Sequence, residues 1–383
     1  MNVKSRAIFN KSLTSVFCLV VLTACQTQGV KHDIEITQSN KAKNIILMIG
    51  DGMGLAQVSA AAQDQTQLLN LERATIVGLS KTGSSKQEIT DSAAGATAFS
   101  IGLKTYNGAI GVDPDGNSKV TILEQLSEQG YSTGLVATSS ITHATPASFY
   151  AHTDSRKNYY EIAAQMASSP VTLFIGGGKK HFYDRVDPNV GPSDDRNLLT
   201  EMSAAGVSMI GDLSELDSHT GRAAYFLAEG HSNSILDGRD DILPRSMLPS
   251  IAFLQKQSSE GFFLMVEGSQ IDWGGHKKDY DYVISELIDF DDALGKVLEF
   301  AEKDGNTLVV VTADHETGGL SLKASNSDDG RDGYEQADHN FSTNGHTSIM
   351  VPVFAFGKGA EHFAGVYENT AIYQKMLDAI GVK

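Results

Sequence analysis

Residues 44–50 read NIILMIG, a stretch without a charged side chain that stops directly before Asp51. Short runs that are apolar almost throughout are typical of strands covered on both faces by other elements. More runs of this kind follow along the chain, and together with the first they predict the strands of a buried sheet: 132–137 (STGLVA), 171–176 (VTLFIG), 223–228 (AAYFLA), 262–267 (FFLMVE), 307–312 (TLVVVT) and 351–356 (VPVFAF).

Amphipathic stretches lie between these runs and predict helices, most clearly at 120–129, 158–167, 243–257 and 280–303. Strand and helix in alternation predict an α/β fold, with a mostly parallel central sheet flanked by helices on both faces. The stretch 325–338, SNSDDGRDGYEQAD, is too polar for a core. We predict that it is an insertion between elements of the sheet.

Residues able to bind a metal stand where the apolar runs stop. Asp51 follows the first run, Glu267 closes the fifth, and Asp314 and His315 follow the sixth, while His143 lies a few residues beyond the second. Ligands of open α/β folds gather at the carboxyl ends of the strands. The sheet is therefore expected to bring these side chains to one edge.

Further candidate ligands lie close by. Asp272 and His276 are spaced i and i+4, so that on a helical turn both project from one face. His346 follows a glycine in the stretch 345–347. A mixture of carboxylate and imidazole suits zinc, whereas an all-oxygen set suits magnesium. A single His–Asp pair would be assigned to a surface loop, but three such clusters favour a metal centre.

The composition limits the function classes. Hydrophobic residues make up 41% of the chain, which is ordinary for a soluble protein with a large core. The formal net charge is −17, which disfavours binding to a nucleic-acid duplex because phosphate backbones attract basic surfaces. An anionic substrate would need a local positive centre, such as a pair of metal ions.

The first 24 residues have the pattern of a signal peptide. A basic start is followed by an apolar stretch, 13–24, that is too short to span a bilayer. The end of this leader, Leu-Thr-Ala-Cys at 22–25, resembles the lipobox of bacterial lipoproteins and predicts an exported protein of the cell envelope, held to the membrane only by a lipid on Cys25. An ordinary secretory signal with a chance cysteine is the alternative. The polar segment 25–42 is expected to be a flexible tether.

Eight motifs carry a resemblance to the alkaline phosphatase family. They occur in the order typical of that family and cover nearly all of residues 44–383: GDGMG at 50–54, TDSAA at 90–94, THATP at 142–146, AHTDSR at 151–156, VEG at 266–268, IDWGGH at 271–276, TADHETGG at 312–319 and GHT at 345–347. The resemblance implies one catalytic domain, 43–383, in which 320–344 is a short form of the crown insertion that many members carry.

The resemblance also implies roles for individual residues. Ser92 would be the nucleophile that takes the phosphoryl group, at a position that equally suits a helix N-terminus. Arg156 would clamp two phosphate oxygens with its planar guanidinium. Two zinc ions (Zn²⁺) would stabilise the attacking and leaving oxygens. Their ligands would be Asp51, Asp314 and His315 for the first ion, and Asp272, His276 and His346 for the second.

A third, oxygen-rich site for magnesium (Mg²⁺) would use Asp51, Thr145 and Glu267, with His143 beside it. This chain departs from part of the family here, because His143 and Trp273 stand where some members carry an aspartate and a lysine. The departure leaves zinc, cobalt or manganese as alternatives for the third ion.

The implied activity is the hydrolysis of phosphate monoesters through a phosphoserine, with a broad substrate range and release of inorganic phosphate. A homodimer is the family's usual state. Two alternatives stay open: a related phosphodiesterase or sulfatase, and a non-catalytic envelope lipoprotein that binds phosphate or zinc. The other histidines fit no ligand cluster and are assigned to loops or the core, although two lie near motifs and could support the ligands (His152 and His339): His32, His152, His181, His219, His231, His339 and His362.

Overall fold

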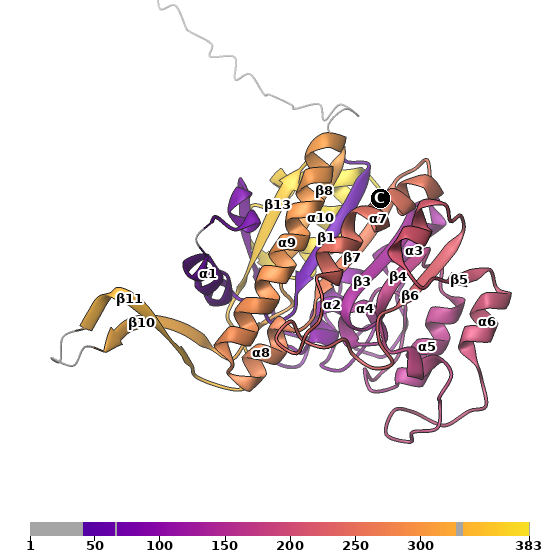
Figure 1. Ribbon diagram of the computed structural model, residues 1–383, viewed down its shortest axis with the longest axis horizontal. Coiled ribbons are helices and arrows are strands. Elements are labelled where there is room, and N and C mark those ends of the chain that lie inside the picture. The colour runs from indigo at the N-terminus through magenta and orange to yellow at the C-terminus, as the bar shows by residue number, and fades with distance from the viewer. Residues whose placement is uncertain (1–40, 66, 327–331, 383) are drawn as a thin grey trace, which may run out of the picture. The chain divides into compact units, whose positions relative to one another are not determined.

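The computed structural model describes residues 41–65, 67–326 and 332–382 (Figure 1). The predicted signal peptide, Cys25 and most of the tether lie outside these residues. All elements below belong to one compact unit, 37–383. Within the described residues, no helix is both long enough and apolar enough to cross a membrane.

Ten strands form the central sheet, in the order β14-β2-β13-β8-β1-β7-β3-β4-β6-β5. Their bounds are β1 (Asn44–Gly50), β2 (Ile76–Lys81), β3 (Ser132–Ser140), β4 (Leu173–Gly177), β5 (Val207–Met209), β6 (Arg222–Phe226), β7 (Phe262–Gly268), β8 (Thr307–Thr312), β13 (Val351–Gly357) and β14 (Gly365–Glu368). Neighbouring strands are parallel, except that β13 runs antiparallel to both β8 and β2. The prediction of a mostly parallel sheet is confirmed.

Helices cover this sheet and connect its strands (Figure 1). The α-helices are α1 (Leu55–Asp64), α2 (Ser92–Ile101), α3 (Ile122–Glu128), α4 (Ala144–Ala147), α5 (Tyr159–Ser168), α6 (Leu198–Ala204), α7 (Ile242–Gln257), α8 (Ile271–Lys277), α9 (Tyr280–Asp304) and α10 (Ala371–Ile380). Short 3-10 helices are η2 (Asn70–Arg73), η3 (Lys179–Phe182), η4 (Leu213–Asp217) and η5 (Ala360–Phe363).

Strand β1 shows why the run NIILMIG has no polar face. Its side chains alternate between two separate hydrophobic cores, as the pleat of a strand requires. Ile45, Leu47 and Ile49 pack in the core that contains α2, α3, α5 and α10. Ile46 and Met48 pack in the core that contains α1, α7 and α9. Both faces are therefore buried, and an apolar residue is needed at every position.

The register of the central strands sets the position of the site. Ile49 of β1 lies opposite Glu267 of β7 on one side and Thr312 of β8 on the other. Ala137 of β3 lies opposite the same Glu267. The carboxyl ends of β1, β7 and β8 are therefore nearly level, while β3 continues a little further, to Ser140. The residues that follow the four strands meet at one edge.

The described part of the predicted insertion 325–338 lies outside the central sheet. Strands β10 (Leu320–Asn326) and β11 (Asp332–Phe341) form a separate antiparallel pair that extends away from the helices and strands of the sheet (Figure 1). At the base of this pair, β9 (Glu316–Thr317) and β12 (His346–Thr347) pair with each other. This small sheet brings two of the ligand motifs together although a 28-residue stretch of sequence, from 318 to 345, lies between them.

Candidate active site

The carboxyl edge of the sheet gathers the predicted ligands into three groups. Within each group, one ligand atom from each residue lies within 4.8 Å of the others. The groups are Asp51, Asp314 and His315; Asp272, His276 and His346; and Asp51, His143 and Glu267. Asp51 belongs to two of them. Thr145 is buried at the start of α4 and its hydroxyl faces Glu267.

Two glycines allow these groups to come so close. Gly52 has a φ of 74°, and a Cβ added there would stand 2.7 Å from the Cα of Asp272. A Cβ at Gly95 of α2 would stand 2.9 Å from the Cβ of Asp314. Only glycine permits both the left-handed turn at residue 52 and the close packing of α2 against the strand end.

Ser92 begins helix α2 beside the first group. The side chain of Asp91 caps this helix by accepting from the Ala94 amide at 3.0 Å. The Ser92 hydroxyl lies 3.3 Å from Nε2 of His315. Arg156 reaches the same place from the loop before α5, donating to Asp91 at 3.0 Å and lying 3.2 Å from Nε2 of His143. Both residues predicted for catalysis therefore adjoin the ligand groups.

The carboxylates of the site are buried close to one another. Both carboxylate oxygens of Asp51 are buried without a hydrogen-bond partner, as are one oxygen of Glu267 and one of Asp314. Burial, followed by the charges of Asp314 and Asp272, raises the pKa of Asp51 well above its usual range. Burial likewise raises the pKa of Glu267 to about 7 and that of Asp314 to about 6. Such a cluster needs positive charge to be stable when ionised.

In the second group, the rings of His276 and His346 turn their Nε2 atoms toward each other. Nδ1 of His276 lies 2.7 Å from the carbonyl oxygen of Asn344, and Nδ1 of His346 lies 2.8 Å from that of Thr90. A carbonyl only accepts, so each Nδ1 carries a hydrogen, and only Nε2 of each ring can offer a lone pair to a metal. Without a metal, the hydrogen bond to Asp272 raises the pKa of His276 to about 9, so a metal ion would have to displace the proton from this nitrogen. The two Nε2 atoms lie 3.2 Å apart, with Asp272 beside both. This donor set fits a cation bound between the rings.

His143 and His315 also have the protonation state of a ligand. Burial, with a further contribution from Arg156, lowers the pKa of His143 well below its usual value. Burial and the nearby His346 lower the pKa of His315 in the same way. Neutral imidazole is the form that binds a metal. The three groups therefore fit divalent cations by charge, by donor type and by proximity.

Comparison with known proteins agrees with this geometry. Residues 42–332 match the family model described as alkaline phosphatase. Alkaline phosphatase 3 of Bacillus subtilis is 35% identical, over 89% of this chain and 89% of its own length. The chain belongs to the alkaline phosphatase family. It is a metal-dependent phosphomonoesterase, as the resemblance of its motifs predicted.

Solved structures of the family have the same fold. The alkaline phosphatase from the Antarctic bacterium TAB5 superimposes with a TM-score of 0.84 at 43% identity, covering 90% of this chain and 99% of that one. A histidine-to-glutamate variant of the TAB5 enzyme is described with magnesium bound in its M3 site.

The structure places one residue beside the third group that the sequence did not assign to any site. His231, expected in a loop or the core, lies with its ring centre 5.5 Å from that of His143 and 4.9 Å from that of Trp273. Its Nδ1 accepts from the Ser140 amide at 3.0 Å. No spacing signal could have found it, because it is separated from every motif in sequence.

Two side chains inside the motifs, the Thr317 hydroxyl and the Glu316 carboxylate, form hydrogen bonds in or beside the ligand groups. Thr317 donates to Asp272 at 2.5 Å and lies 3.2 Å from Nδ1 of His315, so it contacts one residue of the second group and one of the first. Glu316 accepts from the Thr347 hydroxyl at 2.5 Å, directly after His346. Of the two histidines predicted to support the ligands, His339 stacks on Tyr280 and His152 bonds to Glu124.

Proposed function

We propose that this enzyme hydrolyses phosphate monoesters through a phosphoserine at Ser92, with two zinc ions and a third, magnesium-type ion. The observation that carries the proposal is the pair of Nε2 atoms, on His276 and His346, that face each other at 3.2 Å beside Asp272. Two lone pairs held this close repel unless a proton or a cation lies between them. The nearby Ser92 and Arg156 suit a phosphoryl group as the group on which the ions act.

The ligand sets follow the three groups. Asp51, Asp314 and His315 would hold the zinc ion next to Ser92. Asp272, His276 and His346 would hold the second zinc ion. Asp51, Thr145 and Glu267, with His143, would hold the third ion. When bound, the ions supply the positive charge that stabilises the attacking and leaving oxygens of an in-line displacement.

Arg156 and Ser92 would bind the phosphoryl group and accept it. Arg156 binds two non-bridging oxygens of the phosphoryl group and turns the phosphorus toward Ser92. The Ser92 oxygen forms a bond to phosphorus while the bond to the ester oxygen breaks, and the serine proton is finally carried by the departing alcohol. The oxygen of a water molecule then bonds to phosphorus while the bond from phosphorus to the Ser92 oxygen breaks. Ser92 takes up a proton from that water, and inorganic phosphate leaves. Two in-line displacements give net retention of configuration at phosphorus.

The third group differs from an all-oxygen magnesium site. His143 adds an imidazole to the carboxylates of Asp51 and Glu267, and the rings of His231 and Trp273 make edge contacts with it. Imidazole suits zinc and cobalt better than magnesium. The TAB5 variant that holds magnesium has lost a histidine in favour of a carboxylate. We propose that His143 lowers the preference of this site for magnesium.

We also propose that the enzyme is exported, carries a lipid on Cys25 and forms a homodimer. The leader supports export, removal of residues 1–24 and lipidation of Cys25, which would place the enzyme at the bacterial cell envelope. Mass spectrometry of the mature N-terminus tests this, since a Cys25→Ser variant would lose the lipid mass and leave the membrane fraction. The resemblance to the family supports a homodimer, which light scattering on the purified enzyme tests directly.

Substrate class is tested by activity on three esters under identical conditions. We expect p-nitrophenyl phosphate to be hydrolysed far faster than bis-p-nitrophenyl phosphate or p-nitrophenyl sulfate. The reverse order would favour the phosphodiesterase or sulfatase alternative. Across phenyl, sugar and nucleotide monoesters, kcat/KM should vary by less than about a hundredfold if recognition rests on the phosphate. Metal content measured before and after chelation then gives the number and kind of ions that the activity requires.

A further inference from the structure

Arg156 is held by a loop that pairs with a second loop. Its own segment, 151–158, is part of the connection between α4 and α5. The second loop, 105–112, follows α2. Thr153 and Ile110 exchange both backbone hydrogen bonds, at 2.9 and 3.0 Å, and the Arg156 amide donates to the Gly108 carbonyl at 2.7 Å. The position of Arg156 therefore depends on the position of both loops.

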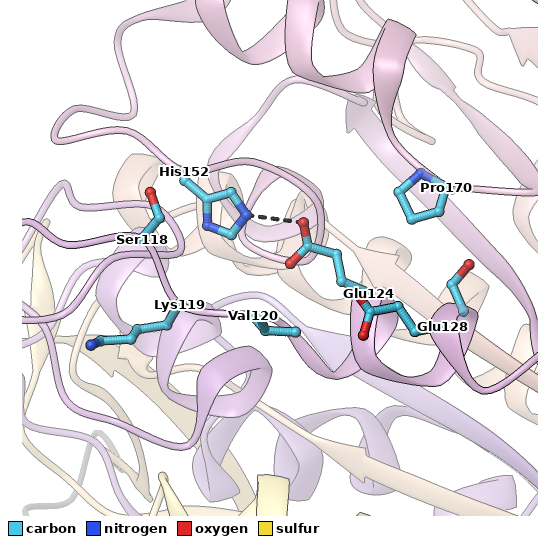
Figure 2. Close-up of a pocket in the computed structure, with 8 residues that line it drawn as sticks. Ser118, Lys119, Val120, Glu124, Glu128, His152 and Pro170 are labelled. Atoms are coloured by element: carbon cyan, nitrogen blue, oxygen red, sulfur yellow. Dashed lines mark hydrogen bonds and ion pairs between the residues drawn. The ribbon is translucent and has the colours of Figure 1, made fainter.

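His152 connects this pair of loops to helices α3 and α5 through hydrogen bonds. Its Nδ1 lies 2.8 Å from the Gly111 carbonyl oxygen, and its Nε2 lies 3.0 Å from a carboxylate oxygen of Glu124 on α3 (Figure 2). The backbone of His152 is held as well, because the side-chain amide of Gln165 on α5 accepts from its nitrogen at 2.8 Å and donates to its carbonyl at 3.0 Å. One residue thus joins α3, α5 and both loops.

The two ring contacts require two donated hydrogens. The Gly111 carbonyl and the ionised Glu124 carboxylate can only accept, so the ring makes both bonds as an imidazolium. Burial by itself lowers the pKa of His152, but the hydrogen bonds to Glu124 and Gly111 and the charge of Glu124 outweigh it and raise the pKa above its ordinary value. Glu124 is fixed in turn, since its other oxygen accepts from the Thr121 amide at 2.8 Å in the cap of α3.

Asp91 connects the paired loops to the helix that begins at Ser92. One carboxylate oxygen of Asp91 accepts from Arg156, and the other accepts from the Gly108 amide at 3.0 Å as well as from the Ala94 amide of helix α2. The loop containing Gly108 and Gly111 therefore connects the His152 ring to the residue that caps the helix of Ser92. A shift of this loop would move Arg156 relative to Ser92.

We propose that His152 is a positioning residue, which holds Arg156 at the distance from Ser92 that phosphate binding requires. The inference rests on the proposed function, in which Arg156 binds the phosphoryl oxygens. Side-chain packing alone does not hold the ring, because His152 and Glu124 also line a pocket of about 410 Å³, together with Val120, Glu128 and Pro170 (Figure 2). The orientation of the ring depends on its hydrogen bonds.

A double-mutant cycle between His152 and Arg156 tests the proposal. The full-length metal-loaded enzyme is compared with His152→Ala, Arg156→Ala and the double variant, with inorganic phosphate as the probe. We expect His152→Ala to weaken phosphate inhibition and to lower kcat/KM for p-nitrophenyl phosphate by roughly 10- to 100-fold, with a smaller change in kcat. In the Arg156→Ala background, the same substitution should change both values by less than about twofold.

Controls separate positioning from unfolding. His219 is a matched control, because it is also a partly buried histidine whose ring lies 3.2 Å from a backbone carbonyl oxygen, that of Arg222. His219→Ala should leave phosphate inhibition unchanged. Melting temperature and zinc content are measured for every variant. Should His152→Ala fail to fold, Glu124→Gln enters the same cycle, since it removes the charge that holds the ring and preserves the shape of α3.

The outcomes are distinguishable. Fold-changes that multiply across the cycle, or a His152→Ala enzyme with unchanged phosphate inhibition, would overturn the positioning role and leave the proposed function intact. An Arg156→Ala enzyme with unchanged phosphate inhibition would overturn the role of Arg156 itself. Loss of the His152 effect when Arg156 is absent, with zinc content and melting temperature preserved, would establish that His152 acts through Arg156.

Discussion

Glu316 accepts a hydrogen bond from the side-chain amide of Gln57 at 2.7 Å, although 259 residues separate the two in sequence. The same buried carboxylate accepts from the Thr347 hydroxyl and from the amides of Gly319 and Leu320. It thereby joins α1 to the small sheet of β9 and β12, which contains His346 and begins directly after His315.

Replacement of Glu316 by alanine should destabilise the protein, because four donors would lose their acceptor in a buried place. We expect a loss of about 3 kcal/mol in the free energy of unfolding, measured by denaturant titration of the zinc-loaded enzyme. Zinc binding should also weaken, since the small sheet orients two ligands. Glu361→Ala, at an exposed position, serves as the control and should stay within about 0.5 kcal/mol of the parent.

Metal removal should make stability depend on pH in a defined direction. Without ions, burial raises the pKa of Asp314 to about 6 and that of Glu267 to about 7. The folded apoprotein then binds more protons than the unfolded chain between the ordinary carboxyl pKa and these values. Its stability must therefore fall as the pH rises through this range.

Bound ions remove this penalty because they stabilise the ionised carboxylates. The gain in melting temperature upon adding zinc to apoprotein should consequently be larger at about pH 8 than at about pH 5. Differential scanning calorimetry of both forms measures it. An equal gain at both values would show that protons and metal ions do not compete for these carboxylates.

Replacement of His143 by aspartate should shift the third site toward magnesium, because an oxygen ligand takes the place of imidazole. Trp273 is the only tryptophan of the chain, and its ring centre lies 6.2 Å from that of His143. Its fluorescence therefore reports on this site in zinc-loaded enzyme titrated with magnesium. We expect tighter magnesium binding in His143→Asp than in the parent. Equal affinities for the two proteins would contradict the assignment of His143 to the third site.

Replacement of Arg156 by lysine should impair phosphate binding although the charge is preserved. An ammonium group cannot reproduce the planar pair of donors that reaches two phosphate oxygens while also bonding to Asp91. We expect kcat/KM for p-nitrophenyl phosphate to fall roughly 10- to 100-fold and phosphate inhibition to weaken in parallel. Lys157→Arg, at the neighbouring exposed position, should change neither value. Full activity in Arg156→Lys would mean that only a point charge is needed.

Replacement of Ser92 by alanine should abolish the covalent intermediate. Turnover should fall by about 10³-fold or more, because the remaining groups can position water but not supply the first acceptor. Acid quenching of the parent enzyme with radiolabelled phosphate should trap label on the peptide that contains Ser92. Unchanged turnover in Ser92→Ala would revive the non-catalytic lipoprotein hypothesis for this site.

Several elements of the fold were beyond prediction from sequence for a common reason. Strand β14 is the edge strand of the sheet and β2 lies next to it. Part of each strand is exposed, so neither has a continuous apolar run. Strand β13 was predicted as a strand, but its antiparallel direction depends on how the chain returns from the β10–β11 pair and leaves no trace in its own residues. Edge strands and strand direction are decided by neighbours, which local sequence does not contain.

The sequence by itself determined the class of fold and the candidate ligand residues. Strands buried on both faces must be apolar at nearly every position, and the candidate ligands follow at their carboxyl ends. Short stretches of sequence are therefore enough to predict the strands and the candidate ligands. Only the tertiary structure decided that His231 joins His143 and Trp273, and that His152 connects Arg156 to α3. Those contacts arise because separate loops converge in space, and no period or spacing along the chain encodes such convergence.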